Sequence, residues 1–266
     1  MTDSSDCDPR DRTLEMGGVV LQALNVLASS VTTKMNAAPS GLWPDFLDCM
    51  SAAVQSADRT LVQDVVDTML REGVSGQEIA GRYIPSVARY LGEEWLADRA
   101  SFAQVSIGSA RLQGLLRHLG PDWCGEDVVP AADAPRCLVM VPAAEQHTLG
   151  ATILAGQLRS SGLSVQLELD LCPNAARSLI SDGDFTALMI SATSRISLDS
   201  LRFLVDTVKA VTSNMPILIG GSVLDHGIDM KAAIGGDVAT SDWNTALRVS
   251  TSKAMEIRTA SCGSRH

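Results

Sequence analysis

The chain has 266 residues, of which 45% are hydrophobic, and it carries a formal net charge of −10. This length allows one large domain or two ordinary domains with well-developed cores. An acidic surface repels phosphate groups, which disfavours direct binding to an anionic membrane, and we expect no strong direct binding to nucleic acid. The apolar stretches are too short to cross a bilayer and the acidic start does not have the order of an export signal, so a cytoplasmic protein is expected.

Helical signals fill the first half of the chain. We expect residues 1–40 to form a polar tail and then a helix, because leucines and valines recur at helical spacing between residues 13 and 34. Residues 41–124 are predicted to form a helical bundle. In this bundle one helix begins near Pro44, and the next takes Asp58 as its N-cap.

Two further helix starts in the bundle have the spacing of a capping box. Ser75 is followed by Glu78, and Ser101 by Gln104, so each serine hydroxyl can accept a hydrogen bond from the backbone three residues on. Between them, Pro85 is expected to end or kink its helix, because proline has no amide hydrogen. The first half is therefore predicted to be all helical.

The second half has a different pattern. Residues 125–135 are small, acidic and proline-bearing, and we interpret them as a linker. Short apolar runs then alternate with amphipathic segments, which predicts a Rossmann-like, doubly wound parallel sheet over residues 136–250. Residues 251–266 are expected to be a flexible tail. The fold class is thus α + α/β. The predicted strands are 137–141, 165–170, 187–191, 216–220 and a short fifth at 236–241, with helices beginning near Leu149, Asn174 and Leu198.

Three unusual stretches fall at the carboxyl ends of the predicted strands, where open α/β sheets bind their ligands. They are EQHTLG at 145–150, SATS at 191–194 and GGS at 220–222, after the first, third and fourth strands. None is a nucleotide fingerprint, since no G-x-G-x-x-G follows the first strand and no G-x-x-x-x-G-K-[ST] occurs. A dinucleotide or nucleoside triphosphate is therefore not the expected ligand.

The three stretches resemble the signature of the cobalamin-binding domains, which is D-x-H-x-x-G, then a serine-containing turn, then G-G. In EQHTLG, Glu145 stands where that family has aspartate, while His147 and Gly150 match. The stretch LGEEWLADRASFAQVSIGSARL, residues 91–112, is similar to the helical cap of the family. The resemblance covers about residues 45–250. It implies a bound cobalamin, adenosyl- or hydroxocobalamin, with His147 as the ligand of the cobalt.

The chemistry of the motif agrees with that role. A neutral imidazole nitrogen is a common metal ligand, and a carboxylate two residues earlier can reach the other ring nitrogen, which fixes the tautomer and raises the basicity of the ligand. Glu145 is one methylene longer than the aspartate of the family, so this pairing departs from the family pattern. The alternative is that His147 is an ordinary structural histidine.

The other predicted cofactor contacts are neighbouring residues of the same three stretches. The glycines would let the nucleotide tail of the cofactor approach the backbone closely, and the hydroxyls would bond its base or phosphate. Alternatively, the glycines only relieve crowding or form turns, and the hydroxyls only cap turns. This set comprises Thr148, Leu149, Gly150, Ser191, Thr193, Gly220, Gly221 and Ser222.

In the helical half, the resemblance places Trp95 over the upper face of the corrin. The alternative is a tryptophan buried between helices. Light sensors of this class that use adenosylcobalamin have a Glu–His pair after the tryptophan, but the matching positions here, near Val105 and Ser106, carry no such pair. This departure argues against the tetramer switch of those sensors, and it makes a smaller upper ligand, such as water or hydroxide, or a histidine from elsewhere in the chain an alternative to an alkyl group.

Among cobalamin-binding domains, the combination of EQHTLGA with a helical cap is most similar to the AerR and PpaA regulators of bacterial photosynthesis genes. That resemblance implies a light- or redox-responsive antirepressor that binds a transcriptional repressor of the CrtJ/PpsR type. No nucleophile–base pair or acid–base carboxylate pair stands out, so we expect a non-enzyme. Three alternatives stay open: a corrinoid carrier for methyl transfer, a haem-binding redox sensor, since an axial histidine also suits iron, and a cofactor-free interaction module.

Overall fold

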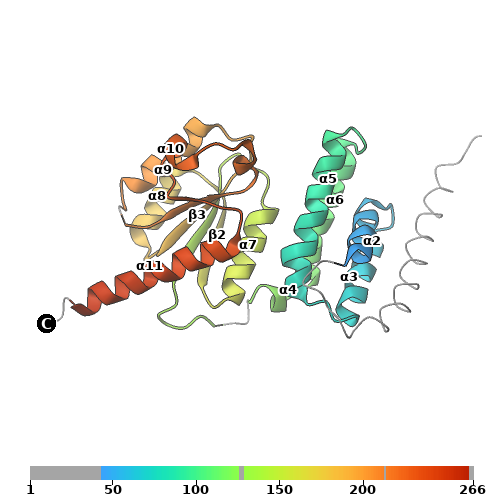
Figure 1. Ribbon diagram of the computed structural model, residues 1–266, viewed down its shortest axis with the longest axis horizontal. Coiled ribbons are helices and arrows are strands. Elements are labelled where there is room, and N and C mark those ends of the chain that lie inside the picture. Colours follow the sequence, from blue (N-terminus) through green and yellow to red (C-terminus); the bar gives the residue numbers. More distant parts are fainter. Residues whose placement is uncertain (1–42, 126–128, 213, 264–266) are drawn as a thin grey trace, which may run out of the picture. The chain divides into compact units, whose positions relative to one another are not determined.

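The computed structural model describes residues 43–125, 129–212 and 214–263 (Figure 1). The predicted tail and helix of residues 1–40 lie outside this part. The chain divides into two compact units between Trp123 and Cys124, and each is described by itself. None of the helices in the described residues combines the length and the apolar character that a membrane crossing needs.

The first unit is helical. Its core lies where the apolar faces of the helices meet, and residues such as Phe46, Met69 and Leu112 are fully buried there. The described elements are α2 (Pro44–Gln55), α3 (Leu61–Arg71), α4 (Gly76–Glu78), the π-helical turn η1 (Ile79–Tyr83), α5 (Ile84–Leu96), α6 (Phe102–His118) and the 3-10 turn η2 (Pro121–Trp123).

The predicted helix start at Pro44 is confirmed, whereas the N-cap predicted at Asp58 is wrong. Helix α3 begins at Leu61, and Thr60 precedes it as the boundary residue. The Asp58 carboxylate accepts hydrogen bonds from the Thr60 amide at 2.9 Å and the Thr60 hydroxyl at 2.8 Å. These bonds close a local turn just before the helix, which is the usual alternative to capping for an aspartate.

Both predicted capping sites are confirmed. The Ser75 hydroxyl accepts a hydrogen bond from the Glu78 amide at 3.1 Å. At the start of α6 the capping box is complete, because Ser101 accepts from the Gln104 amide and the Gln104 side chain accepts from the Ser101 amide. These bonds satisfy amide hydrogens that the first turn of a helix leaves without partners.

Pro85 neither ends nor interrupts the helical path. The chain changes there from the π-helical turn η1 to the α-helix α5, with Pro85 in the first turn of α5. Because proline has no amide hydrogen, the hydrogen-bonding pattern of the helix has to change where Pro85 enters it. The expected disturbance therefore appears as a change of helix type.

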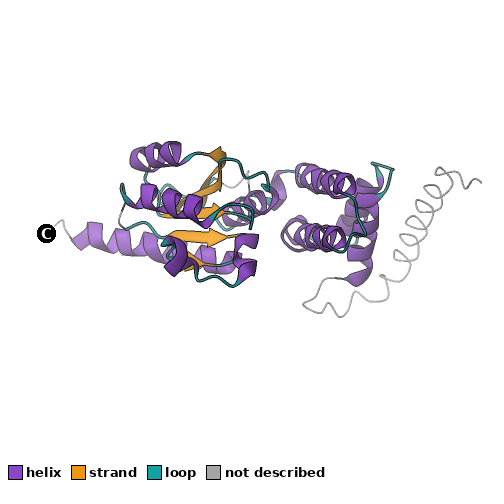
Figure 2. Cartoon of the chain, turned by 90° about the horizontal axis from the view of Figure 1, so that it is seen from above, coloured by secondary structure: helices purple, strands orange, loops and turns teal. Residues whose placement is uncertain are grey.

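The second unit is a five-stranded parallel sheet in the order β2-β1-β3-β4-β5, covered on both faces by helices (Figure 2). This confirms the predicted Rossmann-like doubly wound fold. The strands are β1 (Arg136–Pro142), β2 (Ser164–Leu171), β3 (Ala187–Ser191), β4 (Ile217–Gly220) and β5 (Val238–Ala239). The helices are α7 (Leu149–Ser160), α8 (Pro173–Asp182), α9 (Leu198–Lys209), α10 (Met230–Ile234), α11 (Trp243–Gly263) and the 3-10 turn η3 (Ser222–His226).

Alternate residues of the strands pack into two separate cores. Leu138 and Met140 of β1 face the core under α8, α9 and α10, whereas Cys137, Val139 and Val141 face the core under α7 and α11. Since both faces are covered, each central strand is apolar throughout. This is why these strands are recognisable in the sequence as short apolar runs.

Two segments differ from the sequence-based description. Helix α11 continues through Ser250 to Gly263, where a flexible tail was expected from residue 251. Its first half packs on the unit, since Ala246 and Ala254 are buried and the Ser250 hydroxyl donates to the Ala246 carbonyl at 2.8 Å. In the predicted linker, Gly125 is buried, whereas residues 129–133 are exposed.

Candidate cofactor site at the carboxyl edge of the sheet

The three sequence stretches lie at one edge of the sheet. β1 pairs directly with β3, and β3 with β4, in parallel register. Ser191, the last residue of β3, stands opposite Gly220, the last residue of β4. The loops that follow these strands therefore begin side by side, which confirms the expected grouping of the motifs.

Glu145 is at the centre of this edge. Its side chain is only 3% exposed, although it carries a carboxylate. One oxygen, Oε1, lies 2.6 Å from Nδ1 of His147 and accepts a bond from the His147 amide at 3.0 Å. The other oxygen, Oε2, accepts bonds from the amide of Thr193, at 3.2 Å, and from its hydroxyl. Both carboxylate oxygens are thus satisfied within the protein.

These hydrogen bonds keep Glu145 ionised. Burial alone would raise the pKa of Glu145, because a carboxylate is poorly solvated there. Bonds from the Thr193 hydroxyl, from the His147 ring and from the two backbone amides outweigh burial and lower the pKa of Glu145 from 4.5 to about 2. At neutral pH the group therefore carries a full negative charge beside the His147 ring.

The charge of Glu145 determines the tautomer of His147. An ionised carboxylate only accepts hydrogen bonds, so the proton of the short contact resides on Nδ1 of the imidazole. In the neutral ring this leaves the lone pair on Nε2. The His147 side chain is 56% exposed, so the ring lies where an incoming metal can reach it. A carboxylate–histidine pair of this kind is the usual support of a histidine metal ligand.

Thr193 has a role that the sequence analysis did not predict, because its hydroxyl donates a hydrogen bond to Glu145. The same oxygen accepts a long bond from the Arg195 amide at 3.4 Å. Thr193 therefore holds Glu145 in place across the strand pair β1 and β3. Thr193 and Glu145 are 48 positions apart, so no sequence pattern indicates this contact. The predicted contact of Thr193 with the base or phosphate of the cofactor tail stays a prediction.

The glycines divide into two kinds. A Cβ at Gly221, where φ is +98°, would lie 2.2 Å from the Ala192 carbonyl oxygen, and a Cβ at Gly220 would lie 2.9 Å from that of Thr240. Close backbone packing thus accounts for both residues without a ligand. A Cβ at Gly150 would meet nothing within 4 Å, so the space in front of the first turn of α7 is open to a ligand.

The remaining predicted residues lie at the same edge of the sheet. Thr148 precedes α7 as its boundary residue, and Leu149 is the first residue of that helix; both are partly buried. Ser191 is also partly buried, and Ser222 is exposed at the start of η3. Their contacts with a cofactor stay a prediction.

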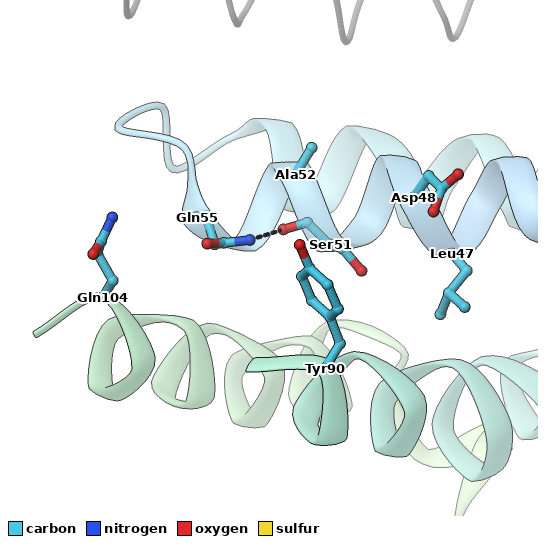
Figure 3. Close-up of a pocket in the computed structure, with 7 residues that line it drawn as sticks. All are labelled: Leu47, Asp48, Ser51, Ala52, Gln55, Tyr90 and Gln104. Carbon is cyan, nitrogen blue, oxygen red and sulfur yellow. Dashed lines mark hydrogen bonds between the residues drawn. The ribbon is translucent and has the colours of Figure 1, made fainter. Parts of the chain in front are cut away.

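In the helical unit, Trp95 lies near the end of α5 and is 39% exposed, so the alternative of a tryptophan buried between helices is wrong. Its contact with a corrin stays a prediction. This unit also has a hollow of about 460 Å³, in which Tyr90 of α5 faces Ser51 and Gln55 of α2 (Figure 3). None of the predicted site residues lines this hollow.

Comparison with known proteins finds a relative in Rhodobacter capsulatus. The chain is 36% identical over 172 residues to a protein of Rhodobacter capsulatus described as an uncharacterized 20.5 kDa protein in the bchF-crtJ intergenic region. The match covers 64% of this chain and 89% of the relative. The chain belongs to the family of this Rhodobacter protein. A search of protein-family models finds no match.

Solved structures share the fold of the chain. The monomethylamine corrinoid protein of Methanosarcina barkeri superimposes with a TM-score of 0.64 over 77% of this chain and 97% of that protein, at 16% identity. A cobalamin-binding protein from Desulfitobacterium hafniense covers 78% of this chain and 98% of its own, at 16% identity and a TM-score of 0.41. The first likeness shows that the chain has the fold of a corrinoid protein.

The low pKa of Glu145 predicts a specific loss of stability in acid. A carboxyl whose pKa falls from 4.5 to about 2 on folding stabilises the native state by about 3 kcal/mol above pH 4.5. This stability is lost as the pH falls toward 2, and about 2 kcal/mol of it is gone by about pH 3. Urea unfolding of wild type and Glu145→Gln, followed by circular dichroism across this range, measures the difference, because the glutamine does not titrate. Parallel pH profiles for the two proteins would contradict the assignment.

Proposed function

We propose that the second unit binds cobalamin with Nε2 of His147 as an axial ligand of the cobalt, and that the chain is a light- or redox-responsive regulator of transcription. The observation that carries the proposal is the pairing of a buried, ionised Glu145 with an exposed His147. In that pair the protein has already fixed the tautomer that a metal requires.

The residues present fit a metal that arrives inside a macrocycle. In the described part of the chain, no group of three or more His, Cys, Asp and Glu side chains gathers as a metal site. Cobalt in a corrinoid takes its other ligands from the macrocycle, so a single histidine such as His147 would be enough to hold it. The open space at Gly150 gives such a large group room beside the first turn of α7.

Each residue of the network has its own task in this proposal. Glu145 holds the His147 ring by its Nδ1 and raises the electron density on Nε2, and Thr193 holds Glu145. These residues would hold the cobalamin, which would supply a light-sensitive bond where its upper ligand is an alkyl group. A protein surface that differs between the two ligand states would then bind its partner unequally.

We propose a transcriptional repressor of the CrtJ/PpsR type as that partner, which makes the chain a non-enzymatic antirepressor. The support is the Rhodobacter capsulatus relative, whose description places its gene between bchF and crtJ. The net charge of −10 argues against direct binding to DNA, so action through another protein is the simpler route.

The light response is tested by loading the protein with adenosylcobalamin in the dark and measuring its affinity for the repressor before and after illumination. We expect a change of at least about fivefold, the lower end of typical coupling between two sites. Hydroxocobalamin, which has no alkyl ligand to lose, is the matched control and should show no change. Equal affinity in dark and light, with adenosylcobalamin bound throughout, would remove the light switch from the proposal.

Two other functions use the same site. The fold is shared with a methylamine corrinoid protein, so a corrinoid carrier is the second candidate. Methylation of the bound corrinoid by a small methyl donor and a partner methyltransferase would favour it. A haem sensor is the third, because His147 also suits iron. A Soret band with little cobalt in the purified protein would favour haem over cobalamin.

A further inference from the structure

Strand β2 has a bulge directly beside the loop that carries His147. Met140 of β1 pairs with Glu168 of β2, but the next pair is Pro142 with Leu171. Between these pairs, β2 has two residues, Leu169 and Asp170, where β1 has one. A bulge of this kind turns side chains away from their regular directions, and bulges are frequent next to functional sites.

The bulge brings together two residues with left-handed backbone conformation. Asp170 has a φ of +59° and Ala144 a φ of +70°, and neither is a glycine. The Ala144 amide donates a hydrogen bond to Oδ1 of Asp170 at 3.2 Å, and the Ala143 amide donates to the Leu171 carbonyl at 3.1 Å. Left-handed backbone is disfavoured for alanine, so Ala144 needs such external contacts to stay in it.

We propose that Asp170 is a positioning residue for the ligand His147, a role that rests on the proposed cobalamin binding. Ala144 immediately precedes Glu145, so its backbone angles decide where the Glu145 carboxylate goes. When the Asp170 carboxylate holds the Ala144 amide, Glu145 points inward to Thr193, and its Oε1 meets the His147 ring. Asp170 itself is exposed and belongs to neither core of the unit. Asp170 therefore acts by fixing the backbone of the loop that carries Glu145 and His147.

Two substitutions separate this role from backbone strain at Asp170. Asn and Gly both tolerate a φ near +59°, but only Asn retains a side-chain oxygen that can accept the Ala144 amide. We expect Asp170→Asn to bind hydroxocobalamin as wild type does. Asp170→Gly should bind about tenfold more weakly, which is the loss expected for one hydrogen bond. Alanine is avoided, because it would add strain of its own at this position.

The decisive readout is coordination by histidine. In protein labelled with [15N]histidine and loaded with cob(II)alamin, electron paramagnetic resonance reports the fraction of cobalt bound to a histidine nitrogen. We expect this fraction to fall in Asp170→Gly and to be retained in Asp170→Asn, with urea midpoints alike in both variants. Full histidine coordination and unchanged affinity in Asp170→Gly would overturn the positioning role. If Asp170→Gly bound hydroxocobalamin more weakly and also had a lower urea midpoint than wild type, the weaker binding would reflect a general loss of stability. That result would also overturn the positioning role.

The same measurements distinguish this inference from the proposed function. If wild type shows no coupling to a histidine nitrogen, or does not bind hydroxocobalamin, the cobalamin proposal itself fails. If wild type shows the coupling and Asp170→Gly shows it equally, cobalamin binding stands and only the role of Asp170 fails.

Discussion

His147→Ala is expected to weaken the binding of hydroxocobalamin by more than about 100-fold, because substitutions of supporting residues alone reach that size and His147 is the ligand itself. The spectral change that accompanies coordination by imidazole should also be lost. The fold should be unaffected, since the side chain is 56% exposed and packs in neither core. Absorption titration gives the affinity, and urea unfolding checks the stability.

His118→Ala is the matched control for this experiment. His118 is also a histidine paired with a carboxylate, since its Nε2 lies 2.8 Å from Oδ1 of Asp67. Its partner belongs to α3 of the helical unit, and neither residue takes part in the Glu145 network. We expect cobalamin affinity to be unchanged in this variant. Equal affinities for wild type and His147→Ala would contradict coordination by His147, and with it the central claim about the site.

Gly221→Ala is expected to destabilise the second unit by more than about 3 kcal/mol, because it combines backbone strain with a backbone clash. Alanine is disfavoured at a φ of +98°, and its Cβ would lie 2.2 Å from the Ala192 carbonyl oxygen. That oxygen cannot move freely, since it accepts the Val223 amide at 3.3 Å. Urea unfolding followed by circular dichroism measures the loss of stability.

Gly150→Ala is the control, and it should act in the opposite way on stability. Gly150 lies in the first turn of α7 and a Cβ there meets no protein atom within 4 Å. Alanine favours the helix by up to about 1 kcal/mol over glycine. If the cofactor approaches this backbone, cobalamin affinity should nevertheless fall in Gly150→Ala. A stability loss in Gly150→Ala as large as that in Gly221→Ala would contradict this division of the glycines.

The amino-acid sequence by itself determined the fold class and most of the elements, but not helix α10 or the full length of α11. Helix α6 is marked by its capping box at Ser101 and Gln104, because that pattern is satisfied within one turn of the chain. The central strands are apolar throughout because both faces of the sheet are covered. The pairing of Glu145 with His147 was foreseeable for the same reason, since the two residues are two positions apart. The wrong N-cap at Asp58 shows where local prediction from sequence ends. An aspartate can either cap a helix or close a turn before it, and the sequence does not decide between the two.

Only the tertiary structure decided how the loops support one another. Thr193 bonds Glu145 because β1 and β3 are neighbours in the sheet, although the two residues are 48 positions apart. Gly221 is required by the Ala192 carbonyl of another loop, and Asp170 reaches Ala144 because of a bulge in the strand register. Periodicity and spacing encode contacts within a turn of helix or along a strand. Contacts between loops depend on strand order, register and backbone angles, which are properties of the folded chain as a whole.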